Sequence, residues 1–225
     1  MITEKVLRAA GASASNAVLY APLLQAACEA PEDSFNKITS RNGQAMVVAQ
    51  SAIESMFFKR TQEDLTYSVK ALKGLIGVDQ RTGRQFRYFT DEQAEAYGYV
   101  DQGKKRVQQP NQRMIANLYY GGRLGNLGTH TDDGWTFKGL TLIQLTGRYN
   151  ITRWAKSNNM SVEEALEWGK TPEGAVNGLL WYWRNHGLLV PASRGDVPTC
   201  TRLIQGGAAH LKERTEIFDR VLPLI

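Results

Sequence analysis

The sequence predicts a mainly α-helical fold, and three observations lead to that prediction. Apolar residues recur with helical spacing along most of the 225 residues. Polar, glycine-rich loops at 76–90 and 121–134 interrupt this pattern. A single apolar run, from Leu140 to Leu145, has the character of a strand. Any sheet is therefore expected to be small.

The periodicity predicts ten helices, some of them with recognisable ends. Their expected ranges are 3–10, 16–29, 41–57, 67–75, 91–97, 110–120, 147–157, 162–169, 172–186 and 208–222. The start and stop signals are capping boxes at Thr90/Gln93 and Ser161/Glu164, first-turn prolines at Pro110 and Pro172, and a helix end at Gly187.

Length and composition are those of an ordinary globular protein. Hydrophobic residues make up 42% and charged residues 22% of the chain. We expect a single domain, 1–225, with an N-terminal helical segment at 1–40 and a main region at 41–225. No run approaches the ~20 apolar residues of a membrane span, so stable membrane insertion is not expected. The N-terminus has the pattern of an amphipathic helix and not of a signal peptide.

The cysteines and histidines give no sign of a metal site or a disulfide framework. Cys28 and Cys200 are the only two cysteines, which is typical of a chain made in a reducing compartment. Each is expected to be a small buried apolar residue. His130, His186 and His210 lie far apart, without a cysteine or carboxylate at ligand spacing. We predict neither a metal nor a cofactor.

The chain is basic, with a net charge of +5 and a pI near 9.2. A basic balance favours approach to polyanions such as nucleic acid, acidic lipids or the bacterial wall. The densest basic group, Lys104-Lys105-Arg106, is short and is interpreted as a solvated loop that aids steering. Nucleic acid is not the expected partner, although a basic helical nucleic-acid-binding protein stays an alternative.

Two glutamates nine positions apart, Glu54 and Glu63, point to acid–base chemistry. Glu54 interrupts an apolar helical stretch, with Gln50 and Phe58 on the same face. Glu63 lies in a polar loop, where Asp64 is an alternative carboxylate. A carboxyl among apolar groups tends to stay protonated, and a solvated one tends to stay ionised. Glycosidic hydrolysis needs one of each, an acid for the leaving oxygen and a base for the attacking water. The alternative is that neither residue is catalytic: Glu54 would lie at the solvent-exposed edge of a buried helix, and Glu63 in a solvated turn.

Sequence motifs extend this interpretation. Residues 134–150, GWTFKGLTLIQLTGRYN, resemble the W-x-Y/F-x-G-R-G-x-I-Q-L-T/S-x-x-Y-N signature of glycoside hydrolase family 19, which holds plant-type chitinases and many phage endolysins. Residues 49–68, AQSAIESMFFKRTQEDLTYS, resemble the endolysin form A-Q-x-x-H-E-S-x-x-F-x-x-x-x-E-x-x-x-Y-S. Residues 201–207, TRLIQGG, resemble T-R-x-I-N-G-G, and Arg214 and Phe218 resemble the R-x-x-x-Y that follows.

The resemblance implies a role for each matching residue. Glu54 aligns with the general acid and Glu63 with the general base, and Thr146 aligns with the residue that helps to hold the attacking water. An inverting arrangement is implied, with the carboxyls roughly 6.5–9.5 Å apart. The implied substrate-binding residues are Gln144, Tyr149, Asn150, Trp135, Gln205 and Arg214. For several of these a structural role is the alternative: Trp135 as core, Thr146 as a turn residue and Arg214 as a helix-surface charge.

The sequence also departs from the family pattern. Ile53 replaces the histidine before the acid, Met56 and Phe57 replace small residues, Leu140-Thr141 replaces Arg-Gly, and Gln205 replaces asparagine. None of these changes removes the predicted acid or base. Activity is therefore expected, on an altered substrate or at a reduced rate.

Together, the motifs imply a two-lobed, lysozyme-like fold and an endolysin that cleaves β-1,4 glycosidic bonds of peptidoglycan. Such an enzyme is expected to be a monomer, stored in the host bacterial cytoplasm and reaching the wall after holin-type release. A chitinase acting on N-acetylglucosamine polymers is the alternative substrate assignment. A non-catalytic wall-binding module with a decayed cleft is the alternative function.

Overall fold

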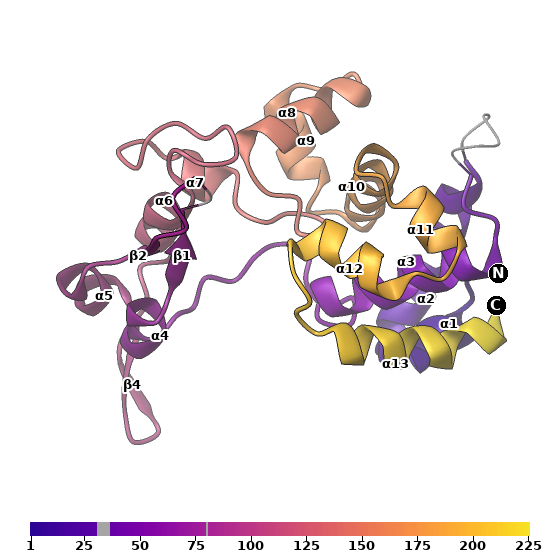
Figure 1. Ribbon diagram of the computed structural model, residues 1–225, viewed down its shortest axis with the longest axis horizontal. Coiled ribbons are helices and arrows are strands. Elements are labelled where there is room, and N and C mark those ends of the chain that lie inside the picture. The colour runs from indigo at the N-terminus through magenta and orange to yellow at the C-terminus, as the bar shows by residue number, and fades with distance from the viewer. Residues whose placement is uncertain (31–36, 80) are drawn as a thin grey trace. The chain divides into compact units, whose positions relative to one another are not determined.

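The computed structural model describes residues 1–30, 37–79 and 81–225 and confirms a mainly α-helical, lysozyme-like fold (Figure 1). Its helices are α1 Glu4–Ala9, α2 Ala14–Glu29, α3 Arg41–Glu54, α4 Val69–Lys73, α5 Asp91–Tyr97, α6 Gln112–Tyr120, α7 Asp133–Thr136, α8 Arg148–Ser157, α9 Val162–Trp168, α10 Pro172–Asn185, α11 Leu189–Ser193, α12 Val197–Gln205, α13 Leu211–Val221 and the 3-10 helix η2 Leu222–Leu224. Two small antiparallel sheets pair β1 Ile76–Val78 with β2 Gln85–Arg87, and β3 Val100–Gln102 with β4 Lys105–Gln108.

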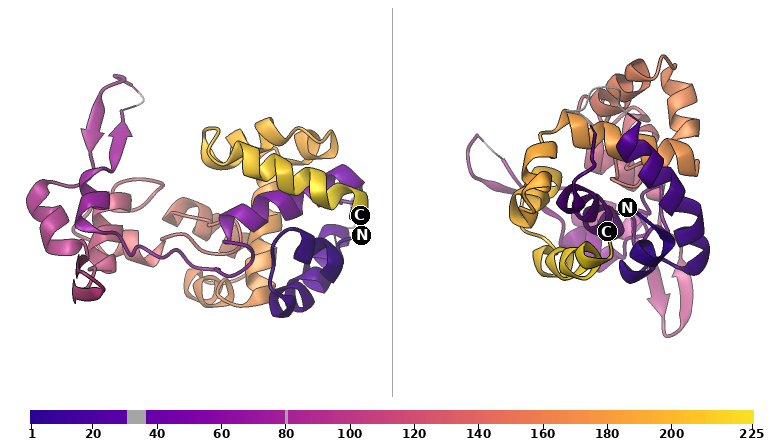
Figure 2. Two further views of the ribbon diagram at one scale, coloured as in Figure 1. Left: turned by 90° about the horizontal axis from the view of Figure 1, so that it is seen from below. Right: turned by 90° about the vertical axis from the view of Figure 1, so that its right-hand side faces the viewer.

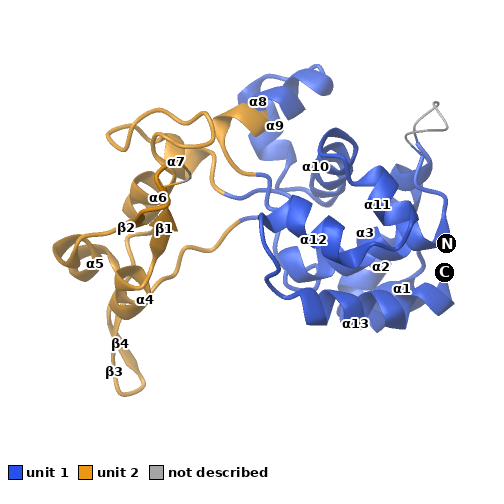
Figure 3. Cartoon of the chain, in the orientation of Figure 1, with its two compact units in different colours: residues 1–62, 139–145, 152–225 blue, residues 63–138, 146–151 orange. Residues whose placement is uncertain are grey.

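The chain forms two compact units (Figure 3). Unit 1 contains Met1–Gln62, Gly139–Leu145 and Thr152–Ile225, and unit 2 contains Glu63–Lys138 and Thr146–Ile151. The predicted helical segment 1–40 supplies α1 and α2 to unit 1. The organisation as one domain with a main region at 41–225 stays a prediction.

Unit 1 is built around α3, which is buried on all sides from Gly43 to Ala52. Helices α11, α12 and α13 pack against α3, and α10 and α1 pack against α2. The chain termini meet in this unit, where the Met1 amino group donates to the Ile225 carbonyl oxygen at 3.1 Å (Figure 2). Three polar residues of this helix, Gln44, Gln50 and Ser51, are buried with it, and each forms a hydrogen bond.

Helix α3 ends at Glu54, three residues earlier than the predicted range 41–57. Three consecutive residues after it, Met56, Phe57 and Phe58, have left-handed backbone with φ of 51°, 61° and 65°. The Phe58 amide donates to Ser55 Oγ at 2.9 Å, which secures the reversal. Side-chain polarity alone does not reveal this break, because Met56, Phe57 and Phe58 continue the apolar pattern. The result is that Glu54 occupies the last helical turn.

Unit 2 has its own small core, to which α4, α5 and α6 contribute. Six buried residues form that core: Leu65, Leu72, Phe89, Ala94, Ile115 and Ala116. Tyrosines and Trp135 pack around it. Helix α6 packs closely on α7, where the Trp135 amide donates to Asn117 Oδ1 at 2.7 Å. The hairpins β1–β2 and β3–β4 are separate two-stranded arms of this unit (Figure 2).

The strand predicted at Leu140–Leu145 is wrong. These residues form a tight turn, with φ of 70° at Thr141 and 56° at Gln144, and Leu140 and Leu145 pair only as an isolated bridge. The run is apolar because it is buried, and burial alone does not distinguish a strand from a turn. Conversely, the predicted loop 76–90 contains the β1–β2 hairpin, and helices α7, α11 and α12 were not among the predicted helices.

Most of the predicted helix ends are confirmed. Both capping boxes are present, at Thr90/Gln93 and Ser161/Glu164. Pro172 begins α10, and Gly187 follows its end with φ of 73°. Pro110 does not lie in a first turn, because Asn111 caps α6 and the proline precedes that cap. The helix therefore begins after Asn111, whose side chain accepts a hydrogen bond from the Met114 amide, and not at Pro110.

Cys28 and Cys200 are free and fully buried, as predicted for small apolar residues. Burial raises the pKa of each thiol to about 12. Across the described ranges, no cluster of three or more histidine, cysteine or carboxylate side chains is placed to hold a metal ion. Over the same residues, no helix has the length and apolar character needed to cross a membrane.

The close packing of α6 on α7 gives a test of the unit 2 core. A Cβ at Gly134 would lie 2.3 Å from the Ala116 carbonyl oxygen and 2.6 Å from Asn117 Cα. Gly134→Ala is therefore expected to lower the free energy of unfolding by about 1–3 kcal/mol. Gly207, which has no atom within 4 Å of an added Cβ, is the control, and Gly207→Ala should stay within about 0.5 kcal/mol. Urea unfolding of both variants checks this, and equal stabilities would contradict it.

Candidate active site

The predicted acid, Glu54, is the centre of a hydrogen-bonded network in unit 1. Arg214 Nη2 from α13 forms an ion pair with Glu54 Oε1. Gln205 Nε2, from the last residue of α12, donates to the same oxygen at 2.9 Å. The Glu54 side chain is 12% exposed, so most of it is buried and a small part is open to solvent. Gln205 and Arg214, which were predicted as substrate-binding residues, thus contact the predicted acid.

Arg214 is not a helix-surface charge, the alternative considered for it. Its side chain is fully buried, and its second terminal nitrogen, Nη1, donates to Gln50 Oε1. Its Nε is buried without a partner among the described residues. A buried guanidinium needs acceptors of fixed geometry, and here Gln50 and Glu54 supply them from consecutive turns of α3. The i and i+4 spacing of these two residues is what allows one arginine to reach both.

Two members of this network were not predicted as site residues, Gln50 and Thr201. Gln50 is fully buried and donates through Nε2 to Thr201 Oγ1 at 3.2 Å. Thr201 in turn donates to the Val197 carbonyl oxygen at 2.8 Å. The chain of bonds therefore runs from the backbone of α12 through Gln50 to Arg214 and Glu54. The signal that could have identified Gln50 is a polar residue four positions before Glu54 on an apolar helix.

Tyr182 is another unpredicted neighbour of Glu54. Its hydroxyl donates to the Leu203 carbonyl oxygen on α12 at 3.1 Å. Burial, followed by the negative charge of Glu54, raises the pKa of Tyr182. The phenol therefore stays neutral, and it lies close enough to Glu54 to respond to the charge of its carboxylate.

The predicted base, Glu63, lies in unit 2, where Tyr120 contacts it. The Tyr120 hydroxyl, at the end of α6, donates to Glu63 Oε1 at 2.7 Å. Glu63 is half-buried, whereas its neighbour Asp64 is exposed. Asp64 Oδ1 accepts from the amide and the hydroxyl of Thr66, at 3.0 and 2.5 Å, and so closes a local turn. Glu63 is thus held by a side chain from α6.

Thr146 and Asn150 also lie in unit 2, at the start of α8. Asn150 Nδ2 donates to the Thr146 carbonyl oxygen at 2.9 Å. Arg148, between them, binds Asp133 through two hydrogen bonds of 2.8 and 2.6 Å. This arginine lowers the pKa of Asp133. A charge-assisted, two-point contact thus fixes the start of α8 against α7.

Trp135 and Tyr149 differ in how open they are to a ligand. Trp135 is half-buried against the unit 2 core, and Lys138 Nζ lies 3.7 Å from the centre of its ring. Tyr149 is 59% exposed. The packing of Trp135 and the position of Lys138 over its ring support a structural role for this tryptophan. The side chain of Tyr149, in contrast, is open to solvent. Their sugar-binding roles stay predictions.

Gln144 belongs to the turn at 141–145 in unit 1, and its Nε2 donates to the Thr141 carbonyl oxygen at 3.2 Å.

Thr141 stands where the family motif has glycine. The φ of Thr141 is 70°, in the left-handed region, where glycine is unstrained and a β-branched residue is strained. This backbone conformation accounts for the glycine in the motif. Thr141 Oγ1 is also buried without a partner among the described residues. Leu140, in place of the motif arginine, is buried and packs close to Gly169.

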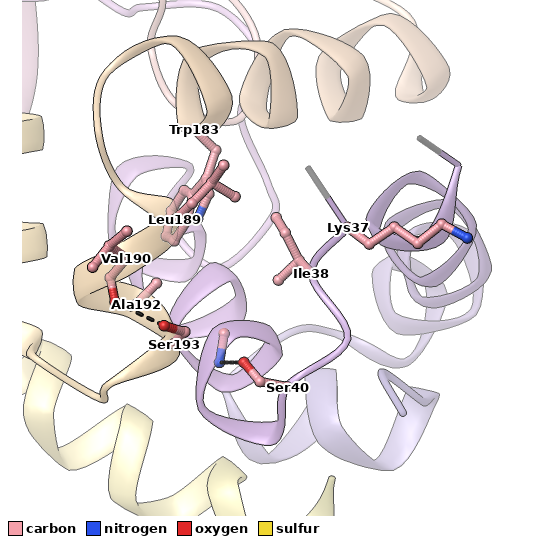
Figure 4. A pocket seen from close by; sticks show the side chains of 9 residues that line it. Lys37, Ile38, Ser40, Trp183, Leu189, Val190, Ala192 and Ser193 are labelled. Carbon is pink, nitrogen blue, oxygen red and sulfur yellow. Dashed lines mark hydrogen bonds between the residues drawn. The ribbon is translucent and has the colours of Figure 1, made fainter. Parts of the chain in front are cut away.

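A cavity of about 180 Å³ also lies in unit 1, but it contains none of the predicted site residues (Figure 4). Its walls come from the start of α3, the end of α10 and α11, with Ile38, Trp183 and Leu189 among the lining side chains. The chemistry predicted from the sequence therefore does not involve this cavity.

Comparison with known proteins identifies one informative relative. No family model matches the chain. A protein of Haemophilus influenzae, described as a glycosyl hydrolase family 19 domain-containing protein, is 33% identical to it over 179 residues. The match covers 80% of this chain and 78% of the relative.

The buried arginine gives a test of the network that surrounds Glu54. Arg214→Ala is expected to lower the free energy of unfolding by about 3–5 kcal/mol, because it leaves Gln50 Oε1 without its donor and Glu54 without its cation. Arg220→Ala, on the exposed face of the same helix, is the control and should change stability by less than about 0.5 kcal/mol. Denaturant unfolding measures both. Similar values for the two variants would show that the network does not stabilise the fold.

Proposed function

Because the chain belongs to glycoside hydrolase family 19, we propose that it is an endolysin, a glycoside hydrolase that cleaves β-1,4 glycosidic bonds of bacterial peptidoglycan. In this proposal Glu54 is the general acid and Glu63 the general base of an inverting reaction. The observation that carries it is the contact of Glu54 with Arg214 and Gln205, three motif residues from three different helices.

The contacts of Glu54 leave Oε2 as the oxygen that carries the proton in this proposal. Both of its donors reach Oε1, and within the described part of the chain Oε2 accepts no hydrogen bond. A proton on Oε2 is then on the oxygen that Arg214 and Gln205 do not contact, and it is available to a glycosidic oxygen. Protonation of the leaving oxygen is the first requirement of glycosidic cleavage, since an alkoxide is a poor leaving group.

The remaining roles are assigned as the motif alignment implies. Glu63 takes the proton of the attacking water, and the Thr146 hydroxyl holds that water, since it can both accept and donate a hydrogen bond. Tyr149 and Asn150 follow on the same turn of α8 and bind sugar hydroxyl or N-acetyl groups. Gln144 from unit 1 supplies a further amide.

Peptidoglycan is preferred to chitin as the substrate for two reasons. The motif at 49–68 has the endolysin form, and a net charge of +5 favours binding to an anionic wall. The reduced, buried cysteines fit a protein stored in the bacterial cytoplasm before release to the wall. Chitin oligomers test the alternative substrate directly.

The acid assignment and the function are tested together by Glu54→Gln. Glutamine keeps the acceptor for Arg214 and Gln205 but has no proton to give, so hydrolysis of purified peptidoglycan should fall by roughly 10²–10⁴-fold. Release of reducing ends is the measurement, with circular dichroism as the fold control and chitin oligomers as the second substrate.

The outcomes of this experiment separate the alternatives. Wild-type protein that pulls down peptidoglycan and releases no reducing ends would be a binding module. Cleavage of chitin in preference to peptidoglycan would make the chain a chitinase. A Glu54→Gln variant that is folded and retains more than about a tenth of wild-type activity would overturn the role of Glu54.

The proposed mechanism also predicts the stereochemistry. An inverting base never bonds to the sugar, so the first product should have the inverted anomeric configuration and no glycosyl-enzyme should form. Proton NMR of the first-formed product measures this. Glu63→Ala should keep detectable activity that azide partly restores, and Thr146→Ala should cost less than Glu63→Ala because it removes only a hydrogen bond to the water. A retained anomer would exclude the mechanism.

A further inference from the structure

The hydroxyl of Tyr120 holds one oxygen of Glu63, and the surroundings make that contact rigid. A glutamate has three side-chain torsions, so a carboxylate on a polar loop is free to sample many positions unless a partner fixes it. Tyr120 OH donates to Glu63 Oε1 at 2.7 Å, the length of a hydrogen bond to a charged acceptor.

Tyr120 itself is held on several sides. Its ring contacts that of Tyr119 edge-on, with centroids 4.8 Å apart and an angle of 71° between the planes. Its carbonyl oxygen accepts from Asn126 Nδ2 and from the Arg123 amide, both at 3.1 Å. Because the backbone and the ring are both fixed, the direction in which the hydroxyl points is fixed as well.

The loop that carries Glu63 is tied to the opposite end of the same helix. The Leu65 amide donates to Gln112 Oε1 at 3.1 Å, and Gln112 Nε2 donates to Thr66 Oγ1 at 3.2 Å. Gln112 begins α6 and Tyr120 ends it. Helix α6 therefore holds the loop by a side chain at each of its ends, one binding the loop beyond Glu63 and one binding the carboxylate.

Three phenols respond to the charge of Glu63, and Tyr120 is the one that hydrogen-bonds to it. Burial is the main cause that raises the pKa of Tyr67, Tyr119 and Tyr120, and the charge of Glu63 adds to it in each case. For Tyr120 the hydrogen bond to Glu63 contributes as well. Tyr120 therefore stays protonated, as a permanent donor to the carboxylate.

We propose that Tyr120 is a positioning residue, which holds the Glu63 carboxylate in the orientation in which it activates water. The inference rests on the proposed role of Glu63 as the base. Tyr120 touches neither substrate nor water in this scheme and acts only through Glu63.

A double-mutant cycle on peptidoglycan fragments tests this. Tyr120→Phe keeps the ring and removes only the hydroxyl, so kcat should fall roughly 10- to 100-fold, the range for a lost hydrogen bond to a charged group, with KM nearly unchanged. In a Glu63→Ala background the same substitution should change kcat by less than about twofold, because no carboxylate remains to be positioned. Tyr119→Phe, the adjacent tyrosine on the same helix, is the matched control and should keep nearly the wild-type kcat.

A second measurement does not depend on activity. The ¹³Cζ resonance of Tyr120 reports the hydrogen bond of its hydroxyl, and at neutral pH it should shift in Glu63→Ala by more than that of Tyr119. Unfolding temperatures of all variants are recorded alongside. If Tyr120→Phe did not fold, this resonance would decide: a shift supports the contact that the proposal needs, and none overturns it.

The possible failures differ from one another. Equal losses from Tyr120→Phe with and without Glu63, or no loss at all, would overturn the positioning role alone. A Glu63→Ala variant as active as the wild type would overturn the proposed base, and the inference about Tyr120 with it.

Discussion

Unit 1 depends on one buried cation, the Arg214 guanidinium. It links α13 to α3 through Gln50 and Glu54, and the bond from Gln50 to Thr201 extends the link to α12. Glu54 needs such a partner, because it lies in the last turn of α3, where the helix dipole disfavours a negative charge. The arginine that neutralises this end of the helix also completes the core. Fold and chemistry therefore share the same ion pair, and neither is easily changed without the other.

The two proposed catalytic carboxylates are held by donors of different kinds. Glu54 is bound by a buried guanidinium and an amide, and Glu63 by a neutral phenol. In both cases the named donors bind Oε1, which helps to fix the orientation of the carboxyl group. In each case the holding residue comes from the core of the same unit, Arg214 from α13 and Tyr120 from α6. Within each unit a rigid helix therefore orients the reacting group.

The helices could be predicted from the sequence because amphipathic spacing and capping residues are local signals. All ten predicted ranges overlap observed helices, and the capping boxes mark two starts correctly. What local signals miss is the backbone after Glu54 and the turn at Leu140–Leu145, because both are set by tertiary packing of apolar residues that fit a helix or a strand equally well. Motif alignment placed Arg214 among the substrate-binding residues, and its contact with Glu54 was not predicted. Gln50 and Tyr120 were missed as site residues, since their roles depend on partners 164 and 57 positions away.

The departures from the family motif gain a physical meaning from the structure. Gln205 is one methylene longer than the asparagine it replaces, and it reaches Glu54 at 2.9 Å, so the polar contact at that position is made. Leu140 is buried, and an apolar side chain there packs into the interior of unit 1.

Thr141 is different, because it occupies a left-handed position that favours glycine and buries a hydroxyl with no partner in the described part of the chain. Its γ-methyl group faces Gly178, where an added Cβ would lie 2.5 Å away, so the turn has little room to relax. Such strain is retained where the surrounding structure over-determines the backbone. The same turn carries Gln144, the amide assigned to substrate binding. The substitutions relative to the family motif thus leave the contacts of Glu54 in place. The backbone strain and the unsatisfied hydroxyl that they introduce lie in the turn that carries Gln144.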